Sequence, residues 1–516
     1  MKKNNKTLFV CICIVLLLPI YNSLQGQTFA NKPDTLVYVK VKNALQKDWV
    51  NSETGDLVLS FMETKAIYKN RIWIISDIKM KGFTGKVDMY NKDSVLTLYM
   101  KETDKNRFEL TDSSGEDTVN CISSNKMSYQ PYTESAMMFT SDTVTYSGCF
   151  VNHWSEKRVK SGTVLVHDII SGTQKTYEFT LDENYFFSIR FPVNNPCQVY
   201  IKLHRLLPVY VEPGKDIFHV ISSRGLRESH TYLGSSGRIN TDLNKMDHIG
   251  FISERLVGNN TVNKFSPDEY KKLLMNDVKT EIDKLNRLAS KASLSERAIQ
   301  IKKMNMVYNS IATLIQFAEN YSVSDNNDIR KVPDNYYDFI TRDITNNPDA
   351  IIYSGYRQFI VQLTNSSILT TGTYKLYSAM DIPDILKRSN TDYPESDKEI
   401  MADLKKLYNA RLLQSGSMTT SIITEFNNKY TPAKIDSFLE RYDYIIAQDY
   451  VQRRAEGIIY NMYTKFGIPS GLTTDILLAR ECYGLTIDGI NISGEFIAAM
   501  RNKITIPFIS EYIEQL

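Results

Sequence analysis

The sequence has no excess of charge of either sign. Its 516 residues include 61 Lys and Arg against 59 Asp and Glu, which gives a formal net charge of +2. Proteins that bind the phosphate backbone need clustered positive charge, so we expect no nucleic-acid partner. A composition of 42% hydrophobic and 23% charged residues excludes disordered and collagen-like chains and is sufficient for several hydrophobic cores.

The sequence also lacks the patterns of several common kinds of site. No two cysteines have the CxxC spacing of a dithiol redox site, no His pair forms HExxH, and no GxSxG turn presents a serine nucleophile. Gly234–Gly237 lacks the Lys-Ser/Thr of a phosphate-binding loop, so it predicts only a helix start. His167 and His219 fall in strand patterns, where we expect half-buried, hydrogen-bonded imidazoles. We therefore identify no catalytic, cofactor-binding or metal-binding residue, and no cofactor.

One long hydrophobic run is present, at the beginning of the chain. Three lysines precede the apolar segment Leu8–Ile20, and a short polar stretch follows up to Gly26. This order is typical of a secretory signal peptide over residues 1–26, so we expect a mature chain that starts at Gln27 and lies in the periplasm. No later run approaches the ~20 apolar residues of a membrane-spanning helix, which predicts no transmembrane helix in the mature chain.

Four cysteines remain after this leader. They are Cys121, Cys149, Cys197 and Cys482. Four cysteines allow three sets of disulfides, and an exported compartment permits them; Cys149 with Cys197 is the candidate pair. A chain of this size has cores large enough to be stable without disulfides, so the main expectation is that the cysteines are buried as small hydrophobic side chains.

Residues 27–141 are predicted to form an antiparallel β domain followed by a linker. Short runs with alternating hydrophobicity are separated by turn residues such as Lys69-Asn70. This pattern predicts a small barrel or sandwich with Trp49 and Trp73 in its core. The polar segment 111–141 is interpreted as the connection to the next unit. The predicted strands are 57–61, 66–68, 72–76, 87–90 and 95–100.

Residues 142–235 are predicted to form a second antiparallel β unit. Seven short strands between residues 143 and 221 indicate a sandwich of immunoglobulin-like or transthyretin-like type. Pro213-Gly214 has the residue types of the two central positions of a type II turn, because proline presets the first φ and glycine accepts the positive second one. We interpret this turn as a hairpin.

Residues 236–516 are predicted to be mainly helical, because the hydrophobic period changes from two to about 3.6. Ser266-Pro267-Asp268-Glu269 has the pattern of a capping box at a helix start, and Thr431-Pro432 places proline in the first turn of another helix. Loops are expected around 322–333 and 382–394. The predicted fold class is α+β, with two β units followed by a helical region.

Several short segments resemble a known protein family, in chain order and over nearly the whole mature chain. They are Asp48–Asn51, Thr54–Asp56, Ala66–Tyr68, Trp73, Tyr146–Gly148, Phe191-Pro192, Val211–Lys215, Leu233-Gly234, Arg238–Leu243, Tyr336–Phe339 and Ile506–Ile509. Together they resemble the N-terminal, non-catalytic β and helical regions of long TlpA-family thiol-disulfide oxidoreductases of Gram-negative envelopes.

In that family a thioredoxin-fold domain with a Trp-Cys-x-x-Cys motif follows the helical region, and this sequence reaches Leu516 without that motif. No catalytic residue of the family can therefore be assigned here. The resemblance implies an exported accessory or substrate-recognition protein that acts beside a thioredoxin-fold partner, or the front part of an interrupted reductase, without redox activity of its own. We expect this chain not to be an enzyme.

Two other hypotheses remain open. The first is an envelope protein that binds a peptide or glycan, with no redox role, through aromatic residues such as Tyr336-Tyr337. The second is a hydrolase that uses paired carboxylates, for which Asp182 with Glu183 and Glu395 with Glu399 are candidates. Acids also have ordinary roles in turns and at helix starts, which is where these pairs are expected to lie.

Overall fold

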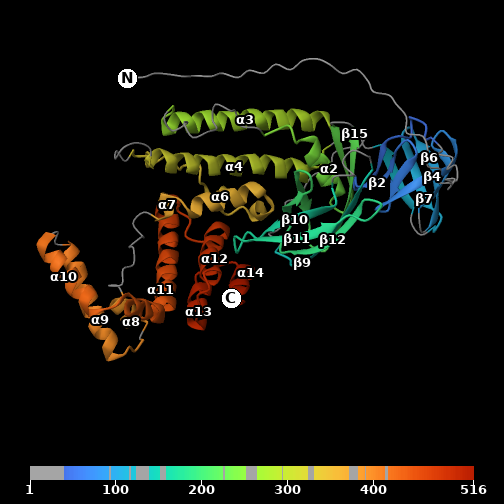
Figure 1. Cartoon of the computed structure of the whole chain (residues 1–516). Coiled ribbons are helices and arrows are strands. Elements are labelled where there is room, and N and C mark those ends of the chain that lie inside the picture. Colours follow the sequence, from blue (N-terminus) through green and yellow to red (C-terminus); the bar gives the residue numbers. More distant parts are fainter. Residues whose placement is uncertain are drawn as a thin grey trace, which may run out of the picture.

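The computed structural model describes residues 40–91, 94–115, 118–123, 139–151, 159–224, 227–250, 264–292, 294–323, 330–370, 382–389, 391–412 and 416–516. The chain is an α+β protein, in which a closed barrel, two further β-sheets and a mainly helical region follow one another along the sequence (Figure 1). The expected signal peptide lies outside the described residues. No helix in this described part is long and apolar enough to span a membrane.

Eight antiparallel strands form the barrel, and β1 pairs with β8 to close it. The strands are β1 (Asp48–Asn51), β2 (Leu57–Phe61), β3 (Lys65–Tyr68), β4 (Arg71–Lys81), β5 (Thr84–Tyr90), β6 (Val95–Asp104), β7 (Arg107–Asp112) and β8 (Thr118–Ser123). Trp49, Trp73 and Phe108 lie in its core, none more than 5% exposed. The predicted core position of both tryptophans is confirmed.

Local sequence explains one of the barrel turns but not its closing strand. Lys69 and Asn70 join β3 to β4 with φ angles of 46° and 55°, as a type I′ turn requires, and this turn matches the twist of antiparallel strands. The polar segment 111–141, interpreted as a connection, instead supplies β8 at its start. β8 has only six residues, and it is a strand because β1 and β7 pair with its two edges.

Two four-stranded sheets follow, with the orders β11-β10-β13-β14 and β12-β9-β15-β16. Their strands are β9 (Asp142–Phe150), β10 (Ser161–His167), β11 (Gln174–Thr180), β12 (Phe186–Val193), β13 (Cys197–Lys202), β14 (Leu206–Val211), β15 (Asp216–Arg224) and β16 (Arg227–Gly234). Side chains of both sheets, among them Tyr146, Val164, Phe191 and Val209, belong to one hydrophobic core. The sheets therefore share a core.

Three details of this unit differ from the predictions. It has an eighth strand, β16, beyond the seven expected. β15 pairs with β9 in parallel, so the unit is not purely antiparallel; the long connection between these strands makes that possible. Pro213-Gly214 is a turn, since Gly214 has φ 71° and Lys215 N donates to Glu212 O at 3.2 Å. This turn is not a hairpin, because β14 and β15 belong to different sheets.

The rest of the described chain is mainly helical. The helices are α2 (Gly237–Lys245), α3 (Pro267–Lys291), α4 (Glu296–Val323), α5 (Arg342–Thr345), the 3₁₀ helix η4 (Pro348–Ile352), α6 (Ser354–Thr364), α7 (Ser367–Thr370), α8 (Ile382–Arg388), α9 (Glu395–Leu412), α10 (Gly416–Lys429), α11 (Pro432–Phe466), α12 (Leu472–Ile487), α13 (Gly494–Arg501) and α14 (Pro507–Glu514). The helix start after Gly234–Gly237 is confirmed by α2.

The helix starts predicted from capping residues are also confirmed. Ser266 and Glu269 form both hydrogen bonds of a capping box at α3, and the Thr431 side chain caps α11 with Pro432 in its first turn. The loop expected around 382–394 is wrong at its start, where α8 lies. Seven residues are too few to show a helical period, and α8 is held by burial of Ile382, Ile385 and Leu386.

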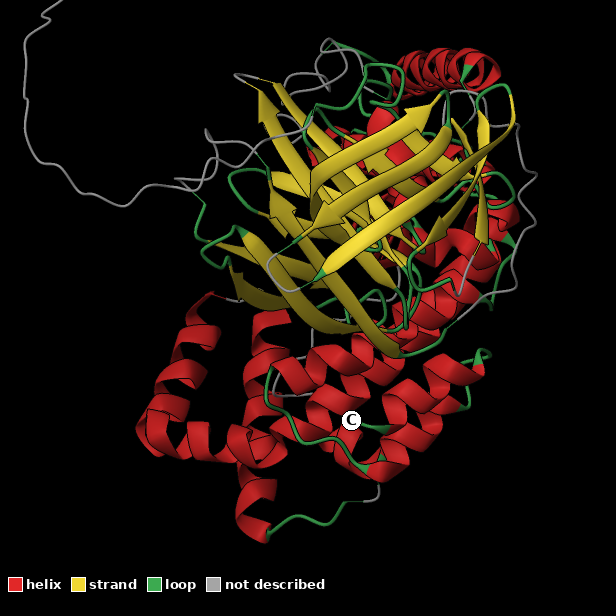
Figure 2. Cartoon of the chain, turned by 90° about the vertical axis from the view of Figure 1, so that its right-hand side faces the viewer, coloured by secondary structure: helices red, strands yellow, loops and turns green. Residues whose placement is uncertain are grey.

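The helices pack on the second β unit and continue away from the barrel. In Figure 1, α3, α4 and α6 lie side by side next to the sheets, and α9 and α10 lie at the end opposite the barrel. Figure 2 shows the strands in front of the helices. The largest core joins Ile169, Ile170 and Tyr210 of the β unit to side chains of the helices. The two regions are therefore packed as one body.

Candidate functional site

A cavity lies where the second β unit meets the first helices. Its volume is about 320 Å³, within the range of small-ligand sites, which are frequent at junctions between structural units. Side chains of β13, β14, β16 and the β13–β14 turn form one wall, and α2, α3 and α4 form the other. We call it the junction cavity; Gln198, Arg205, Tyr232, Glu281 and Lys302 are among its lining residues.

Charged groups are divided between the two walls. Asp247, Asp277 and Glu281 lie on the helical side, whereas Arg205 lies in the β13–β14 turn. Burial acts to raise the pKa of Glu281, but hydrogen bonds from the Lys284 ammonium and from Gly250 N outweigh it, so this pKa is lowered. Glu281 is therefore a fixed negative charge at the cavity wall.

Lys302 brings a positive charge to the helical wall, from α4. Burial lowers the pKa of its ammonium, while the charges of Asp247 and Glu281 act in the opposite direction. Among the described residues its ammonium has no hydrogen bond or ion pair. A half-buried ammonium without a bonded partner is expensive to maintain, so a ligand that accepts a hydrogen bond from Lys302 would gain from it.

Amide side chains on the wall are fixed by hydrogen bonds to the backbone and to each other. Asn240 accepts from Tyr210 N at 2.7 Å and donates to Tyr210 O at 2.8 Å, which joins α2 to β14. Asn305 donates to Gln198 Oε1 at 2.7 Å and accepts from Gly355 N at 2.9 Å. The oxygen of Gln198 is thus engaged, and its amide nitrogen has no acceptor among the described residues, which leaves it as a donor for a ligand.

A buried chain of hydrogen bonds runs behind the strand wall. His219 Nδ1 is 2.8 Å from Tyr146 Oη, and His219 Nε2 is 2.9 Å from His230 Nδ1. Arg205 donates from Nη2 to His230 Nε2, and the His219 ring stacks on Tyr232 with 4.1 Å between ring centroids. Because Arg205 and Tyr232 line the cavity, this chain connects the cavity wall to the core between the sheets.

Arg205 determines which atoms donate and which accept along this series of hydrogen bonds. A guanidinium only donates hydrogen bonds, so His230 Nε2 accepts, His230 Nδ1 donates to His219, and His219 Nδ1 donates to Tyr146 Oη. Both imidazoles are then neutral. Burial lowers the pKa of His219 well below its ordinary value, with further lowering by His230 and Arg205, and burial raises the pKa of Tyr146. The hydrogen bonds of His219 and His230 therefore hold the guanidinium group of Arg205 in position, and both imidazoles that do so are uncharged.

The four cysteines are free thiols. Burial raises the pKa of each to about 12, so the thiolate needed for redox chemistry is scarce at neutral pH. The candidate pair Cys149–Cys197 is not formed. Cys149 packs with Phe218 and Val220, whereas Cys197 packs against the core between the sheets. The expectation of cysteines buried as small hydrophobic side chains is confirmed for Cys121, Cys149 and Cys482, whereas Cys197 is partly exposed.

The tyrosine pair and the histidine singled out in the sequence pack within the fold. Tyr336 is fully buried and donates from Oη to Leu314 O at 3.1 Å, and Tyr337 packs in the same cluster. Tyr336 therefore offers no ring face to a ligand, whereas Tyr337 is partly exposed. His167 is half-buried, as expected, but the predicted hydrogen bond is missing at Nδ1, which has no partner among the described residues. Burial together with the charge of Arg357 lowers its pKa to about 4.

The carboxylate pairs proposed for a hydrolase have ordinary roles. Asp182 Oδ1 accepts the backbone N–H groups of Asn184 and Phe186 in a turn. The two acids near the start of α9 form ion pairs with different lysines, Glu395 with Lys398 and Glu399 with Lys429. These contacts explain both positions without catalysis.

The chain matches no protein-family model, no curated protein and no solved structure. The residues of the junction cavity were not found by the sequence reasoning, because they come from separate strands and helices. One signal was present: His219 and His230 lie on neighbouring strands, and the pairing of His219 with Tyr232 and of Ile221 with His230 makes the two histidines diagonal neighbours. This signal required β16, which was not predicted.

Proposed function

We propose that this chain is an exported recognition protein that holds a short peptide segment in the junction cavity and has no thiol redox activity of its own. The observation that carries the proposal is the arrangement of charge in the cavity: Arg205 lies on the strand wall, whereas the helical wall has three carboxylates, Asp247, Asp277 and Glu281, and one ammonium, that of Lys302.

A peptide end or a short peptide has groups that complement both walls. Its ammonium is suited to the three carboxylates, and its carboxylate is suited to the guanidinium fork of Arg205, which the buried histidine chain holds in position. Leu206, Leu207 and Pro208 add apolar surface to the strand wall for a side chain of the ligand. A volume of about 320 Å³ limits the bound segment to a few residues.

The wider role rests on the TlpA-like resemblance. It supports a periplasmic location and a thioredoxin-fold partner that supplies the dithiol, while the raised pKa of all four thiols supports the lack of redox activity in this chain. We also assign the unit of two sheets to the immunoglobulin-like or transthyretin-like sandwiches; its shared core supports this assignment.

Binding of short peptides to the protein from Gln27 to Leu516, measured by calorimetry, tests the proposal. We expect Arg205→Met and Asp247→Asn to weaken binding about tenfold, because Arg205 lies against the carboxylate of the peptide and Asp247 against its ammonium. Lys303→Met and Asp283→Asn are matched controls, since both residues are exposed and lie outside the cavity, and both should bind like the unaltered protein. Equal affinities in all four variants would contradict the site.

An insulin-reduction assay tests the redox part separately. The purified protein should not exceed the rate without protein, and turnover above that rate would refute this part of the proposal. Binding of neutral oligosaccharides at the cavity, with no binding of peptides, would instead establish the alternative of a glycan-binding protein.

A further inference from the structure

β14 forms one edge of its sheet, and this edge borders the junction cavity. In the sheet order β11-β10-β13-β14, only β13 pairs with it. The first three residues of the strand, Leu206, Leu207 and Pro208, line the cavity. An unpaired strand edge is a template for another extended chain, so the directions of its backbone N–H and C=O groups decide what can bind there.

A hydrogen bond in the β13–β14 turn fixes these directions at the start of β14. Opposed residues of two antiparallel strands alternate between pairs that bond to each other and pairs whose N–H and C=O groups point away. Leu203 N donates to Arg205 O at 3.0 Å, so these two residues form a bonded pair. The next pair is Lys202 with Leu206. The N–H and C=O groups of Leu206 therefore point away from β13.

The other end of β14 gives the same alternation. Asn240 of α2 accepts from Tyr210 N and donates to Tyr210 O, so the backbone groups of Tyr210 also point away from β13. Pro208 lies between Leu206 and Tyr210 and has no backbone N–H, which suits a residue of an edge strand. Asn240 thus takes the place of a paired residue at Tyr210, and the edge stays open only at Leu206 and Pro208.

Three backbone atoms at the open part of this edge have no partner within the described part of the chain. They are the nitrogen and oxygen of Leu206 and the oxygen of Pro208. An extended peptide has the matching groups, because one of its residues can bond to both atoms of Leu206 and the residue two places away can donate to Pro208 O. Asn240 closes the edge beyond this point, so about three residues fit.

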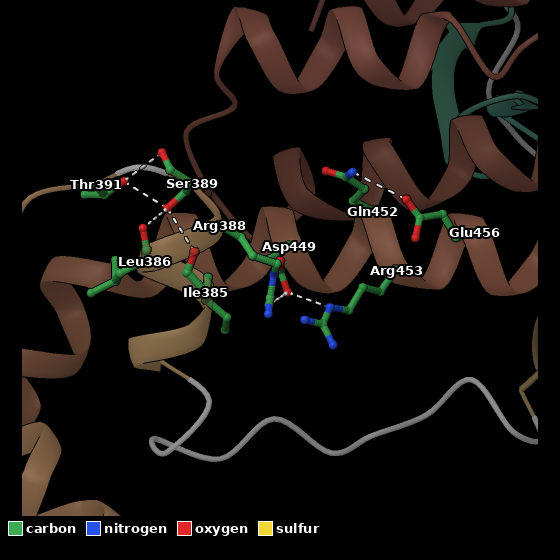
Figure 3. A network of polar contacts seen from close by, with 9 residues as sticks. All are labelled: Ile385, Leu386, Arg388, Ser389, Thr391, Asp449, Gln452, Arg453 and Glu456. Atoms are coloured by element: carbon green, nitrogen blue, oxygen red, sulfur yellow. Dashed lines mark hydrogen bonds and ion pairs between the residues drawn. The ribbon is translucent and has the colours of Figure 1, made fainter.

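Another hollow, between α8, α11 and α13, has guanidinium groups that are already paired. Its volume is about 790 Å³, and the described residues that line it belong to these helices and to the segments next to them. Arg388 donates to Asp449 from Nε at 3.2 Å and from Nη2 at 3.0 Å, and Arg453 Nε lies 3.0 Å from the same carboxylate (Figure 3). Arg388 is therefore a suitable control for Arg205.

We propose that the peptide in the junction cavity is bound as an additional strand, antiparallel to β14, with its C-terminal residue opposite Leu206. This inference rests on the proposed function, in which Arg205 binds the carboxylate of the peptide. Because Arg205 directly precedes Leu206, a peptide that extends from it along the edge runs toward Asn240, opposite to the direction of β14.

In this arrangement the main chain of the peptide makes the hydrogen bonds. The N–H of the C-terminal residue donates to Leu206 O, and the carboxylate accepts from Leu206 N as well as from Arg205. The nitrogen two residues earlier donates to Pro208 O, and the N–H between them points away from β14. Since these bonds involve no side chain of the ligand, the site accepts peptides of different sequence.

Binding of trialanine and of two ester analogues to the protein from Gln27 to Leu516, measured by calorimetry, tests the proposal. In each analogue lactic acid replaces one alanine, which removes one N–H and keeps both terminal charges. The ester at the third residue should weaken binding about tenfold, because Leu206 O loses its donor. The ester at the second residue should bind like trialanine. Equal affinities of all three ligands would overturn the added strand and leave the proposed peptide binding intact, whereas no binding of trialanine would overturn both.

Variants of the protein separate the charge contact from the backbone contact. Arg205→Met should weaken binding of all three ligands by the same factor of about ten, so the ratio between trialanine and the third-residue ester should remain. Arg388→Met removes a guanidinium outside the junction cavity and should change neither the affinities nor the ratio. A ratio that disappears in Arg388→Met would show that the ester effect does not arise at β14 and would overturn the proposal.

Hydrogen exchange gives a direct measurement on β14. Leu206 has the one outward amide of this strand without an acceptor, since Pro208 has no N–H and Tyr210 N bonds to Asn240. Saturation with trialanine should slow exchange at Leu206 at least about tenfold, because the peptide carboxylate accepts from it. Exchange in the edge strand β11 of the same sheet should not change. Unchanged exchange at Leu206 with trialanine bound would overturn the proposal.

Discussion

Arg205 fixes the hydrogen bonds of two buried histidines, because a guanidinium has no acceptor atom. The result is a neutral His219 inside the sheets, with its pKa well below the ordinary value. The sequence predicted only part of this arrangement. His219 was expected to be hydrogen-bonded within a strand, but its partners Tyr146 and His230 were not predicted. The alternating pattern places a side chain on a face, and does not identify the side chain opposite.

The neutral His219 gives a pH dependence of stability that can be measured. Below an unfolded-state pKa near 6.5 the unfolded chain takes up a proton at this residue and the folded chain does not, so the free energy of unfolding falls as the pH falls. Between about pH 7 and pH 5, urea unfolding should show a steeper fall for the unaltered protein than for His219→Gln. The exposed His248→Gln serves as control and should keep the original slope; parallel curves for all three proteins would contradict the assignment.

At the scale of elements, capping residues located helix starts correctly. In a capping box the serine side chain accepts from the backbone N–H of the glutamate, and the glutamate side chain accepts from the backbone N–H of the serine. Both hydrogen bonds are made within four consecutive residues, so the pattern can be recognised from the local sequence. β1, β7, β8, β16 and α8 were not predicted, for the opposite reason. Their short sequences are compatible with loops, and pairing or burial against distant segments decides their structure.

The capping box of α3 gives a prediction at this scale. Ser266→Ala should lower the free energy of unfolding by about 1 kcal/mol, because Glu269 N loses its side-chain acceptor. Ser290→Ala, near the other end of the same helix, removes an exposed hydroxyl that donates to Arg287 O and should change stability by less than about 0.5 kcal/mol. Chemical denaturation of both variants makes the comparison, and equal effects would mean that the cap does not stabilise α3.

At the scale of the whole molecule, the barrel has its own core and a smaller contact with the rest. Ile67, on the outside of the barrel wall, is fully buried in a cluster with Phe218, Val220 and Leu233 of the second β unit. The β unit and the helices, in contrast, share the largest core. Tyr512 of α14 also donates to Asp168 of the β unit. The barrel is therefore the part most easily separated.

Truncation of Ile67 tests how strongly the barrel depends on this contact. Ile67→Ala should destabilise the barrel by about 2 to 5 kcal/mol, as expected for a buried aliphatic side chain. Tryptophan fluorescence during denaturation is a suitable measurement, since Trp49 and Trp73, two of the three tryptophans, lie in the barrel core. Val95→Ala, in the same barrel at a side chain that is 78% exposed, should be nearly neutral. An unchanged midpoint for Ile67→Ala would show that the barrel is stable alone.

The sequence by itself determined the α+β class, the order of β and helical regions, the buried tryptophans and the absence of a dithiol motif, because period, capping and spacing are local properties. Only the tertiary structure decided the closure of β1 on β8, the parallel pairing of β9 with β15 and the free state of Cys149 and Cys197. The junction cavity also belongs to this second group. Each of these features brings together segments far apart in the chain, and their contacts depend on packing that no local pattern contains.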